Sequence, residues 1–299
     1  MSSSLYRVLS SGSQGYSLFS FTDSSISIHK IRGKLVFKEG TLLVGDFVSL
    51  DDDGFICSLQ ERNALLKRPR LANPDWVLIL VSAKEPAFSS YLLDKFLSLV
   101  NFSSVKSAIC ITKADLLTKT EIKKLRTRLS YYERLGYPVF FVDAHKKTSF
   151  DFPSLLEFIT SKTVAFVGQT GVGKSSLLNS IDPDFRRKVD SLNIAYGRGR
   201  HTTKEVVLLP YNDGFLFDTA GFSDLKLTDM KPADLAVFFP GFESNYGNCK
   251  FKDCLHLPKT KGCEIIKSVE EDELSEDSYQ NYVKINEEVK ANDIWKKKL

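Results

Sequence analysis

The chain has 299 residues, of which 42% are hydrophobic and 26% are charged, with a formal net charge of +4. This composition is that of a globular protein of two or three domains, and the weak positive charge permits an anionic partner without identifying one. The longest apolar run, residues 77–81, is far shorter than the ~20 residues of a membrane helix, and residues 1–20 hold no continuous apolar core. We therefore expect a cytoplasmic protein with reduced cysteines and neither a membrane contact nor a secretory signal.

Residues 1–70 contain short strand-like runs separated by turns, which predicts a small β-barrel. Residues 25–29 alternate between polar and apolar, and residues 34–37 and 42–50 are further strand-like runs. The acidic segment 51–54 is either a hairpin turn or a metal loop. A turn is favoured, because no downstream glutamate stands at the spacing of a calcium loop.

From residue 75 to about 235, apolar runs alternate with longer helical patterns, as in a parallel α/β fold. The predicted elements are strands 77–81, 108–111, 139–142 and 163–167, helices 90–100, 120–135 and 152–160, and a hairpin of 206–210 with 215–217. From residue 231 the chain is helix-like, then cysteine-bearing, and it closes with a helical tail over 268–299. The predicted domains are residues 1–70, 71–230 and 231–299.

A phosphate-binding loop follows the predicted strand 163–167. Residues 168–175 match G-x-x-x-x-G-K-[ST], and the strand before and helix after argue against a merely structural glycine-rich turn. Backbone N–H groups can curl around phosphates there, Lys174 can reach the β and γ oxygens for binding and catalysis, and the Ser175 hydroxyl can ligate Mg²⁺. The expected nucleotide contacts in this loop are Gly168, Gln169, Thr170, Gly171, Val172, Gly173, Lys174, Ser175 and Ser176.

Two further motifs indicate the base and the reaction. Asp218 follows the strand 215–217 and can hold the Mg²⁺ shell, and the Gly221 N–H can sense a γ-phosphate. Residues 112–115, Thr-Lys-Ala-Asp, follow the strand 108–111 and fit a guanine-reading [N/T]-K-x-D motif. The Asp115 carboxylate can accept two N–H bonds from guanine, a pair that adenine does not offer, so base discrimination can be large. Thr112, Lys113 and Asp115 are therefore expected to bind the guanine end of GTP or GDP.

The order of these motifs is unusual, since the guanine motif precedes the phosphate loop by more than fifty residues. A parallel sheet keeps its structure when old chain ends are joined and new ones are opened at an exposed loop. All motifs can therefore still meet at one nucleotide. The sequence predicts a GTP hydrolase built on a circularly permuted α/β P-loop domain.

A cluster of cysteines and one histidine near the C-terminus has the spacing of a metal site. Cys249, Cys254, His256 and Cys263 offer three thiolates and one imidazole, a closed tetrahedral set for one structural Zn²⁺. Buried free cysteines are the alternative. Cys57 and Cys110 stand alone in strand-like runs, and both are expected in the core.

Over nearly its full length the chain resembles the RsgA/YjeQ family of small-ribosomal-subunit-dependent GTPases. The resemblance is carried by residues 44–46, 72–73, 112–115, 168–176, 199–203, 218–222 and 249–263. It implies an N-terminal barrel of the oligonucleotide-binding (OB) type, the permuted GTPase domain, and a zinc-binding, mostly helical C-terminal domain. It also implies GTP hydrolysis stimulated by the small ribosomal subunit, late maturation of that subunit, and contact with its rRNA. Separately from the resemblance, we expect a monomer.

The segment 199–203 lies where a mobile switch loop belongs, and Thr203 or Thr202 could complete the Mg²⁺ shell. Phe222 stands where many GTPases have a water-orienting glutamine, and an apolar ring cannot orient water. By resemblance His201 takes this catalytic role, with a surface or RNA-contacting histidine as the alternative. We expect slow intrinsic turnover that a partner raises.

Two residues depart from the family pattern. Thr112 stands where asparagine is usual and keeps one hydrogen-bonding oxygen. Asp143 replaces the usual serine beside Ala144, whose backbone is expected to contact guanine. We expect both changes to affect nucleotide affinity more than the choice of base.

Contact with RNA has weaker support in the sequence, since each basic cluster taken singly is more typical of a solvated face. These clusters are residues 67–70, 123–128, 186–188 and 296–298. Three functions stay open: a GTPase activated by the small subunit, one that acts on the large subunit or another RNA, and a nucleotide-gated RNA-binding scaffold.

Overall fold

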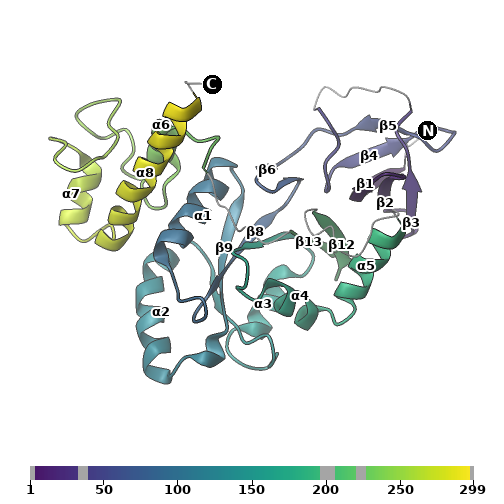
Figure 1. The fold of residues 1–299 in the computed structure, drawn as a ribbon, viewed down its shortest axis with the longest axis horizontal. Helices are drawn as coiled ribbons and strands as arrows, with labels where there is room; N and C mark the ends of the chain where they lie inside the picture. The colour runs from purple at the N-terminus through teal and green to yellow at the C-terminus, as the bar shows by residue number, and fades with distance from the viewer. Residues whose placement is uncertain (1–3, 33–39, 196–205, 220–226, 297–299) are drawn as a thin grey trace.

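The computed structural model describes residues 4–32, 40–195, 206–219 and 227–296. Figure 1 shows the N-terminal strands at one end of the molecule, helices α6, α7 and α8 at the other, and the central sheet with its helices between and below them.

The N-terminal part is a closed five-stranded antiparallel sheet in the order β3-β2-β1-β4-β5. A bridge between Ile31, two residues after the end of β3, and Ile56 of β5 closes the sheet, and the Ile56 N–H donates to the Lys30 carbonyl. Closure of this order gives a barrel of the OB type around a small apolar core, as predicted. The predicted strand 34–37 lies outside the described residues. The strands are β1 (Leu5–Gly12), β2 (Gly15–Ser20), β3 (Ile26–His29), β4 (Phe47–Leu50) and β5 (Ile56–Leu59).

The strand expected over 42–50 is shorter in the structure, because only Phe47–Leu50 forms β4. Gly45 has φ +95°, and a Cβ there would lie 2.0 Å from the Ala72 carbonyl oxygen. The chain therefore turns at Gly45 before entering the barrel. The acidic segment 51–54 is a turn as favoured, since Gly54 donates to the Asp51 carbonyl.

Arg7 joins the barrel to the central sheet. Its guanidinium lies between the rings of Phe47 and Phe215, at 4.7 and 4.6 Å from their centroids. It also donates to the Thr163 hydroxyl at 2.8 Å and to the Asn73 carbonyl at 2.9 Å. Burial lowers the pKa of Arg7 to about 10, so it stays charged at neutral pH. Arg7 of the barrel is thus held by contacts with Phe215 and Thr163 of the central sheet.

The central sheet has six strands in the order β10-β9-β8-β11-β13-β12, and only β12 is antiparallel to its neighbour. Residues of β8 alternate between two apolar clusters, one on each face, which explains its continuous hydrophobic sequence. The strands are β8 (Trp76–Ser82), β9 (Lys106–Thr112), β10 (Val139–Phe141), β11 (Thr163–Gly168), β12 (Val207–Tyr211) and β13 (Gly214–Asp218). The flanking helices are α1 (Ser90–Phe102), α2 (Lys119–Arg134), α3 (Phe152–Ile159), α4 (Lys174–Ile181) and α5 (Phe185–Ala195).

The strand order of the central sheet and the hairpin of β12 with β13 agree with the expected α/β arrangement. The parallel strands β8, β9, β11 and β13 all end at one edge of the sheet, and each of their following segments carries a predicted motif or contacts one. The predicted hairpin is present, with Asn212 and Asp213 at φ +41° and +59° as a type I′ turn requires. A second, short hairpin pairs β6 (Leu65–Lys67) with β7 (Arg70–Ala72).

The C-terminal part consists of α6 (Pro232–Phe238), α7 (Glu264–Glu270) and α8 (Glu276–Lys296). Helix α8 contacts α1 and α6, and its apolar residues belong to the same core cluster as one face of the central sheet. The helical tail expected over 268–299 is confirmed for Glu276–Lys296, but it does not run unbroken from residue 268, because the chain turns between α7 and α8, where Asp272 has φ +59°. Among the described residues no helix is both long and apolar enough to cross a membrane.

Candidate functional site

The phosphate loop connects the end of β11 to the start of α4. Gly171 and Gly173 have φ +83° and +92°, where side chains with a Cβ are strained, and a Cβ on Gly168 would lie 2.6 Å from the Leu80 carbonyl oxygen. Three glycines of the motif are therefore required by geometry. The exposed residues Ser175 and Ser176 lie in the first turn of α4, where backbone N–H groups have no partner within the helix.

Lys174 and Asp218 meet beside this loop. Asp218 is the last residue of β13, the neighbour of β11, and its carboxylate forms an ion pair with the Lys174 ammonium group. The Lys174 side chain is 10% exposed and the Asp218 side chain is 30% exposed, so this pairing is partly shielded from water. Asp218 is thus placed next to the phosphate loop, as a residue of a Mg²⁺ shell must be.

The guanine motif is tied to the phosphate loop. Thr112 ends β9, and its hydroxyl donates to the Val172 carbonyl at 2.5 Å. Lys113 has φ +56°, and its ammonium group donates to the Glu85 carbonyl in the loop before α1. Asp115 follows in a 3₁₀ turn and is exposed, with its carboxylate available to a ligand. The hydroxyl that Thr112 keeps therefore serves to join two motifs far apart in sequence.

The loop at Ala144 completes the same edge. The Ala114 N–H donates to the Val142 carbonyl at 3.1 Å, and the Ser180 hydroxyl of α4 donates to the Ala144 carbonyl. The nearly buried Asp143 carboxylate accepts the His145 N–H at 2.7 Å. Asp143 thus stabilises the turn of its own loop.

Residues 112–115, 143–145, 168–175 and 218 therefore converge at one edge of the sheet. His201, Thr202, Thr203, Gly221 and Phe222 lie outside the described residues, so their roles stay predictions. Sequence reasoning missed Glu85 and Ser180. Glu85 contributes only a backbone carbonyl and Ser180 only a tertiary contact, and neither leaves a signal in the sequence.

The four predicted zinc ligands form a compact cluster, with all ligand atoms within 4.8 Å of one another. His256 Nδ1 lies 3.5 Å from the sulfurs of both Cys249 and Cys263, and these sulfurs are 3.9 Å apart. Zn–S bonds of ~2.3 Å in a tetrahedron give a similar separation of roughly 3.8 Å. The donor set and its spacing therefore fit Zn²⁺.

The electrostatics of this cluster also fit a metal. Burial lowers the pKa of His256 to about 4, so its ring is neutral and can ligate. Burial raises the pKa of Cys263 to about 12, so a thiolate there needs a cation to stabilise it. Backbone N–H groups of His256 and Glu264 donate to the sulfurs of Cys254 and Cys249, as in the outer shell of zinc sites.

The two remaining cysteines differ. Cys110 is fully buried in β9, as expected, and burial raises the pKa of its thiol well above its usual range. The expectation for Cys57 is wrong, because this residue is exposed on β5. Strands of a small barrel are half exposed, so a strand-like sequence alone does not place a side chain inside.

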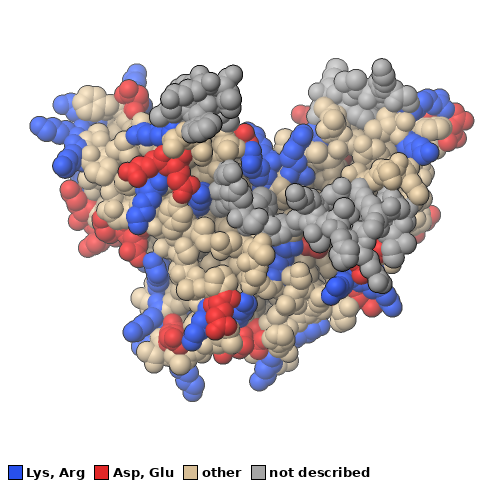
Figure 2. All heavy atoms as spheres, viewed as in Figure 1, with Lys and Arg blue, Asp and Glu red and all other residues tan. Residues whose placement is uncertain are grey.

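Many charges of the predicted basic clusters are engaged within the chain. Arg68 pairs with Asp229, Arg126 with Asp151 and Arg128 with Asp277. Arg187 and Lys188 pair with neighbouring aspartates. On the face of the molecule drawn in Figure 2, Lys and Arg are mixed with Asp and Glu and are not gathered in one patch.

Comparison with known proteins agrees with the geometry. The chain is 38% identical over 277 residues to the small ribosomal subunit biogenesis GTPase RsgA of Shouchella clausii, covering 91% of this chain and 94% of that one. It is 35% identical over 282 residues to RsgA of Bacillus subtilis, with 92% and 94% coverage.

Two solved structures share the fold at 32% identity. The circularly permuted GTPase YloQ has a TM-score of 0.78, with 97% of this chain and 96% of that one covered. YjeQ from Thermotoga maritima has a TM-score of 0.81, with 96% and 98% coverage. A family model described as RsgA GTPase matches residues 59–228. With its phosphate loop, guanine motif and permuted strand order, the chain belongs to the RsgA GTPase family and is a circularly permuted GTP hydrolase.

Proposed function

We propose that this GTPase is stimulated by the small ribosomal subunit and acts in the late maturation of that subunit. The hydrogen bond from Thr112 to the Val172 carbonyl carries the assignment of the nucleotide site, because it joins the guanine motif to the phosphate loop. The partner is supported by the relatives, which are named small ribosomal subunit biogenesis GTPases. The chain would act in the cytoplasm as a monomer.

Each site residue has a defined role in this proposal. Backbone N–H groups of the phosphate loop and the Lys174 ammonium group bind and neutralise the phosphates, and Asp115 accepts the two guanine N–H groups. Ser175 and Thr203 would hold Mg²⁺, with Asp218 in its outer shell, and the ion would neutralise charge on the β and γ oxygens. His201 would orient the attacking water.

The zinc cluster would have a structural role. Its four protein ligands fill a tetrahedral shell and leave no position for a substrate. Tyr279 of α8 donates to the His256 carbonyl at 3.0 Å, and Tyr282 donates to the Leu255 carbonyl at 2.5 Å. The metal loops, which are residues 239–263 between α6 and α7, would thereby be fixed to the longest helix of the C-terminal part.

Contact with rRNA is proposed for the metal loops. Tyr246 and Phe251 are 44% and 50% exposed there, and the Lys250 ammonium group lies 5.7 Å from the Phe251 ring centroid. Lys252, Lys259 and Lys261 are also exposed in these loops. Exposed rings among lysines are typical of surfaces on which unpaired bases stack.

Turnover assays with ribosomal particles test the partner. Phosphate release is measured with purified small subunits, with large subunits and with neither. We expect stimulation by small subunits alone, and Lys174→Ala serves as the inactive control. Stimulation by large subunits alone, or by no particle, would refute the proposal, the latter in favour of a scaffold.

A variant of the switch histidine tests the catalytic assignment. His201→Ala is expected to slow subunit-stimulated turnover while leaving the affinity for a GTP analogue unchanged, because it removes only a water-orienting group. Normal stimulated turnover in this variant would show that another group orients the water.

Substitutions in the metal loops test RNA binding. Phe251→Ala should weaken binding of a labelled single-stranded RNA by about 1–3 kcal/mol, the usual contribution of one stacked base. Phe150→Ala, which removes a 38% exposed ring outside the metal loops, is the matched control. Equal affinities of the two variants in fluorescence anisotropy would exclude the metal loops as the RNA contact.

A further inference from the structure

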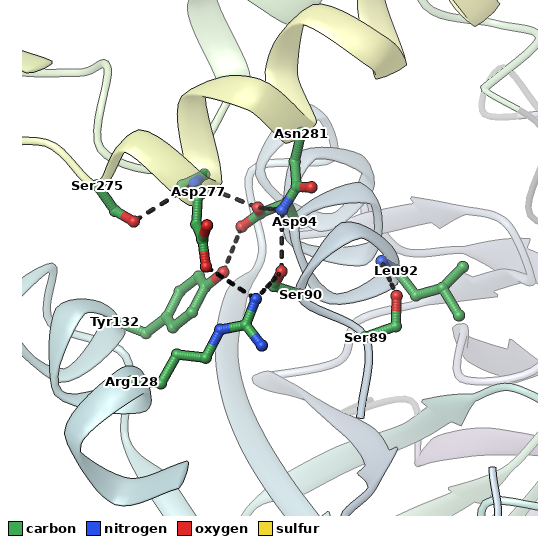
Figure 3. Close-up of polar contacts among 10 residues, drawn as sticks. Ser89, Ser90, Leu92, Asp94, Arg128, Tyr132, Ser275, Asp277 and Asn281 are labelled. Carbon is green, nitrogen blue, oxygen red and sulfur yellow. Dashed lines mark hydrogen bonds and ion pairs between the residues drawn. The ribbon is translucent and has the colours of Figure 1, made fainter. Parts of the chain in front are cut away.

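A buried carboxylate connects the C-terminal helix to the GTPase part, away from the nucleotide and metal sites. Asp94 lies on α1 with no exposed surface. Tyr132 of α2 donates to its Oδ1 at 2.7 Å, and Asn281 of α8 donates to its Oδ2 at 2.7 Å. Ser278 of α8 donates to the same Oδ2 at 3.3 Å. One side chain is therefore held by groups on two other helices (Figure 3).

Charged groups on the same three helices flank Asp94. Arg128 of α2 donates to Asp277 of α8 and to the Ser90 hydroxyl of α1, each at 2.9 Å. Lys95 of α1 pairs with Glu288, also on α8. Among these described residues Arg128 is the cation that lowers the pKa of Asp94, and it does so less than the three neutral donors. The Asp94 carboxylate is thus stabilised mainly by hydrogen bonds from the neutral side chains of Tyr132, Ser278 and Asn281.

Burial dominates this environment and raises the pKa of Asp94 from 3.8 to about 7. The neighbouring phenols do not titrate in this range, since burial raises the pKa of Tyr131 to about 12 and that of Tyr132 further. A protonated carboxyl also fits the geometry, because the Ser278 hydroxyl beside Oδ2 can accept as well as donate, while Tyr132 keeps donating to Oδ1.

We propose that Asp94 is a protonation-sensitive latch that holds α8 most firmly against α1 and α2 when it carries a proton. When α8 separates from α1, or the chain unfolds, water reaches the carboxyl group and the cost of burying its charge disappears. The docked state therefore binds the proton more tightly than the opened state, and docking weakens as the pH rises.

The latch lies next to the start of α1. Asn281 donates to the Ser90 hydroxyl at 3.1 Å as well as to Asp94, and Ser89 caps the helix by accepting the Leu92 N–H. The loop before this turn supplies the Glu85 carbonyl that holds Lys113 of the guanine motif. When α8 is docked it therefore contacts the first turn of α1, and the loop before α1 holds Lys113 of the guanine motif.

The magnitude follows from proton linkage. A carboxyl with a pKa of about 7 when docked and 3.8 when open makes the opening equilibrium constant about tenfold larger at pH 8 than at pH 6. The stabilisation is complete below pH 3.8, is lost progressively as the pH rises from 3.8 through 7, and changes little at higher pH. The same factor applies whether α8 opens alone or with the whole chain.

Hydrogen exchange of the full-length, zinc-loaded protein tests the latch. Protection of α8 amides, corrected for intrinsic exchange, should fall about tenfold from pH 6 to pH 8 in the wild type. Asp94→Asn, which resembles the protonated acid, should remove this fall. Glu276→Gln is the matched control, since it removes an exposed carboxylate from the first turn of α8 and should behave as the wild type.

The proposal is overturned if the wild type shows no such pH dependence, or if Asp94→Asn shows the same one. Tyr132→Phe provides an independent arm should Asp94→Asn fail to fold. It removes a donor that stabilises the ionised form, so the pKa of docked Asp94 should rise and the fall in protection should extend to higher pH. An unchanged midpoint in Tyr132→Phe would also overturn the latch.

Discussion

The hydrogen bond between Thr112 and Val172 makes a sharp prediction about nucleotide affinity. Thr112 is 2% exposed and Val172 is 3% exposed, so water cannot easily replace the hydroxyl. Thr112→Val keeps the side-chain shape but leaves the Val172 carbonyl unpaired, at a cost of about 1–3 kcal/mol. If this whole cost falls on the nucleotide-binding arrangement, guanine nucleotide affinity drops about 5- to 150-fold.

Titration with a fluorescent GDP analogue measures this effect, and Thr112→Ser, which keeps the hydroxyl, is the control. Turnover at saturating GTP should stay close to wild type, because Thr112 supports the base end rather than the transferred phosphate. A Thr112→Val protein of unchanged circular dichroism that binds GDP within about twofold of wild type, below the range the lost bond implies, would refute the reasoning.

Three other predictions concern separate parts of the chain. Asp115→Asn should weaken GTP binding by at least about 100-fold and favour xanthosine nucleotides, because its amide replaces an acceptor by a donor; competition titrations measure both. Gly45→Ala should lower the free energy of unfolding by about 2–4 kcal/mol in urea titrations, since its Cβ would lie 2.0 Å from the Ala72 carbonyl oxygen at positive φ. Cys254→Ser should lower bound zinc, measured by elemental analysis, and the melting temperature together, whereas Cys57→Ser, at an exposed cysteine outside the cluster, should change neither.

Much of the site could be predicted from local sequence because its chemistry is local. The phosphate loop needs glycines at fixed positions for its backbone conformation, and the structure places Gly171 and Gly173 at positive φ. The zinc ligands likewise lie within a short stretch, so their spacing limits their geometry. Strand and helix periodicity was sufficient for the parallel sheet, whose buried strands are continuous apolar runs.

Tertiary structure decided what depends on contacts between distant residues. It showed that Thr112 acts by binding the phosphate loop, that Asp143 stabilises its own turn, and that much of the basic charge is paired within the chain. It also placed Asp94 under α8, where helical periodicity alone gives no reason for a buried carboxylate. Sequence patterns report which residues share a face of one element, whereas partners across elements are set by packing, and packing exists only in the folded chain.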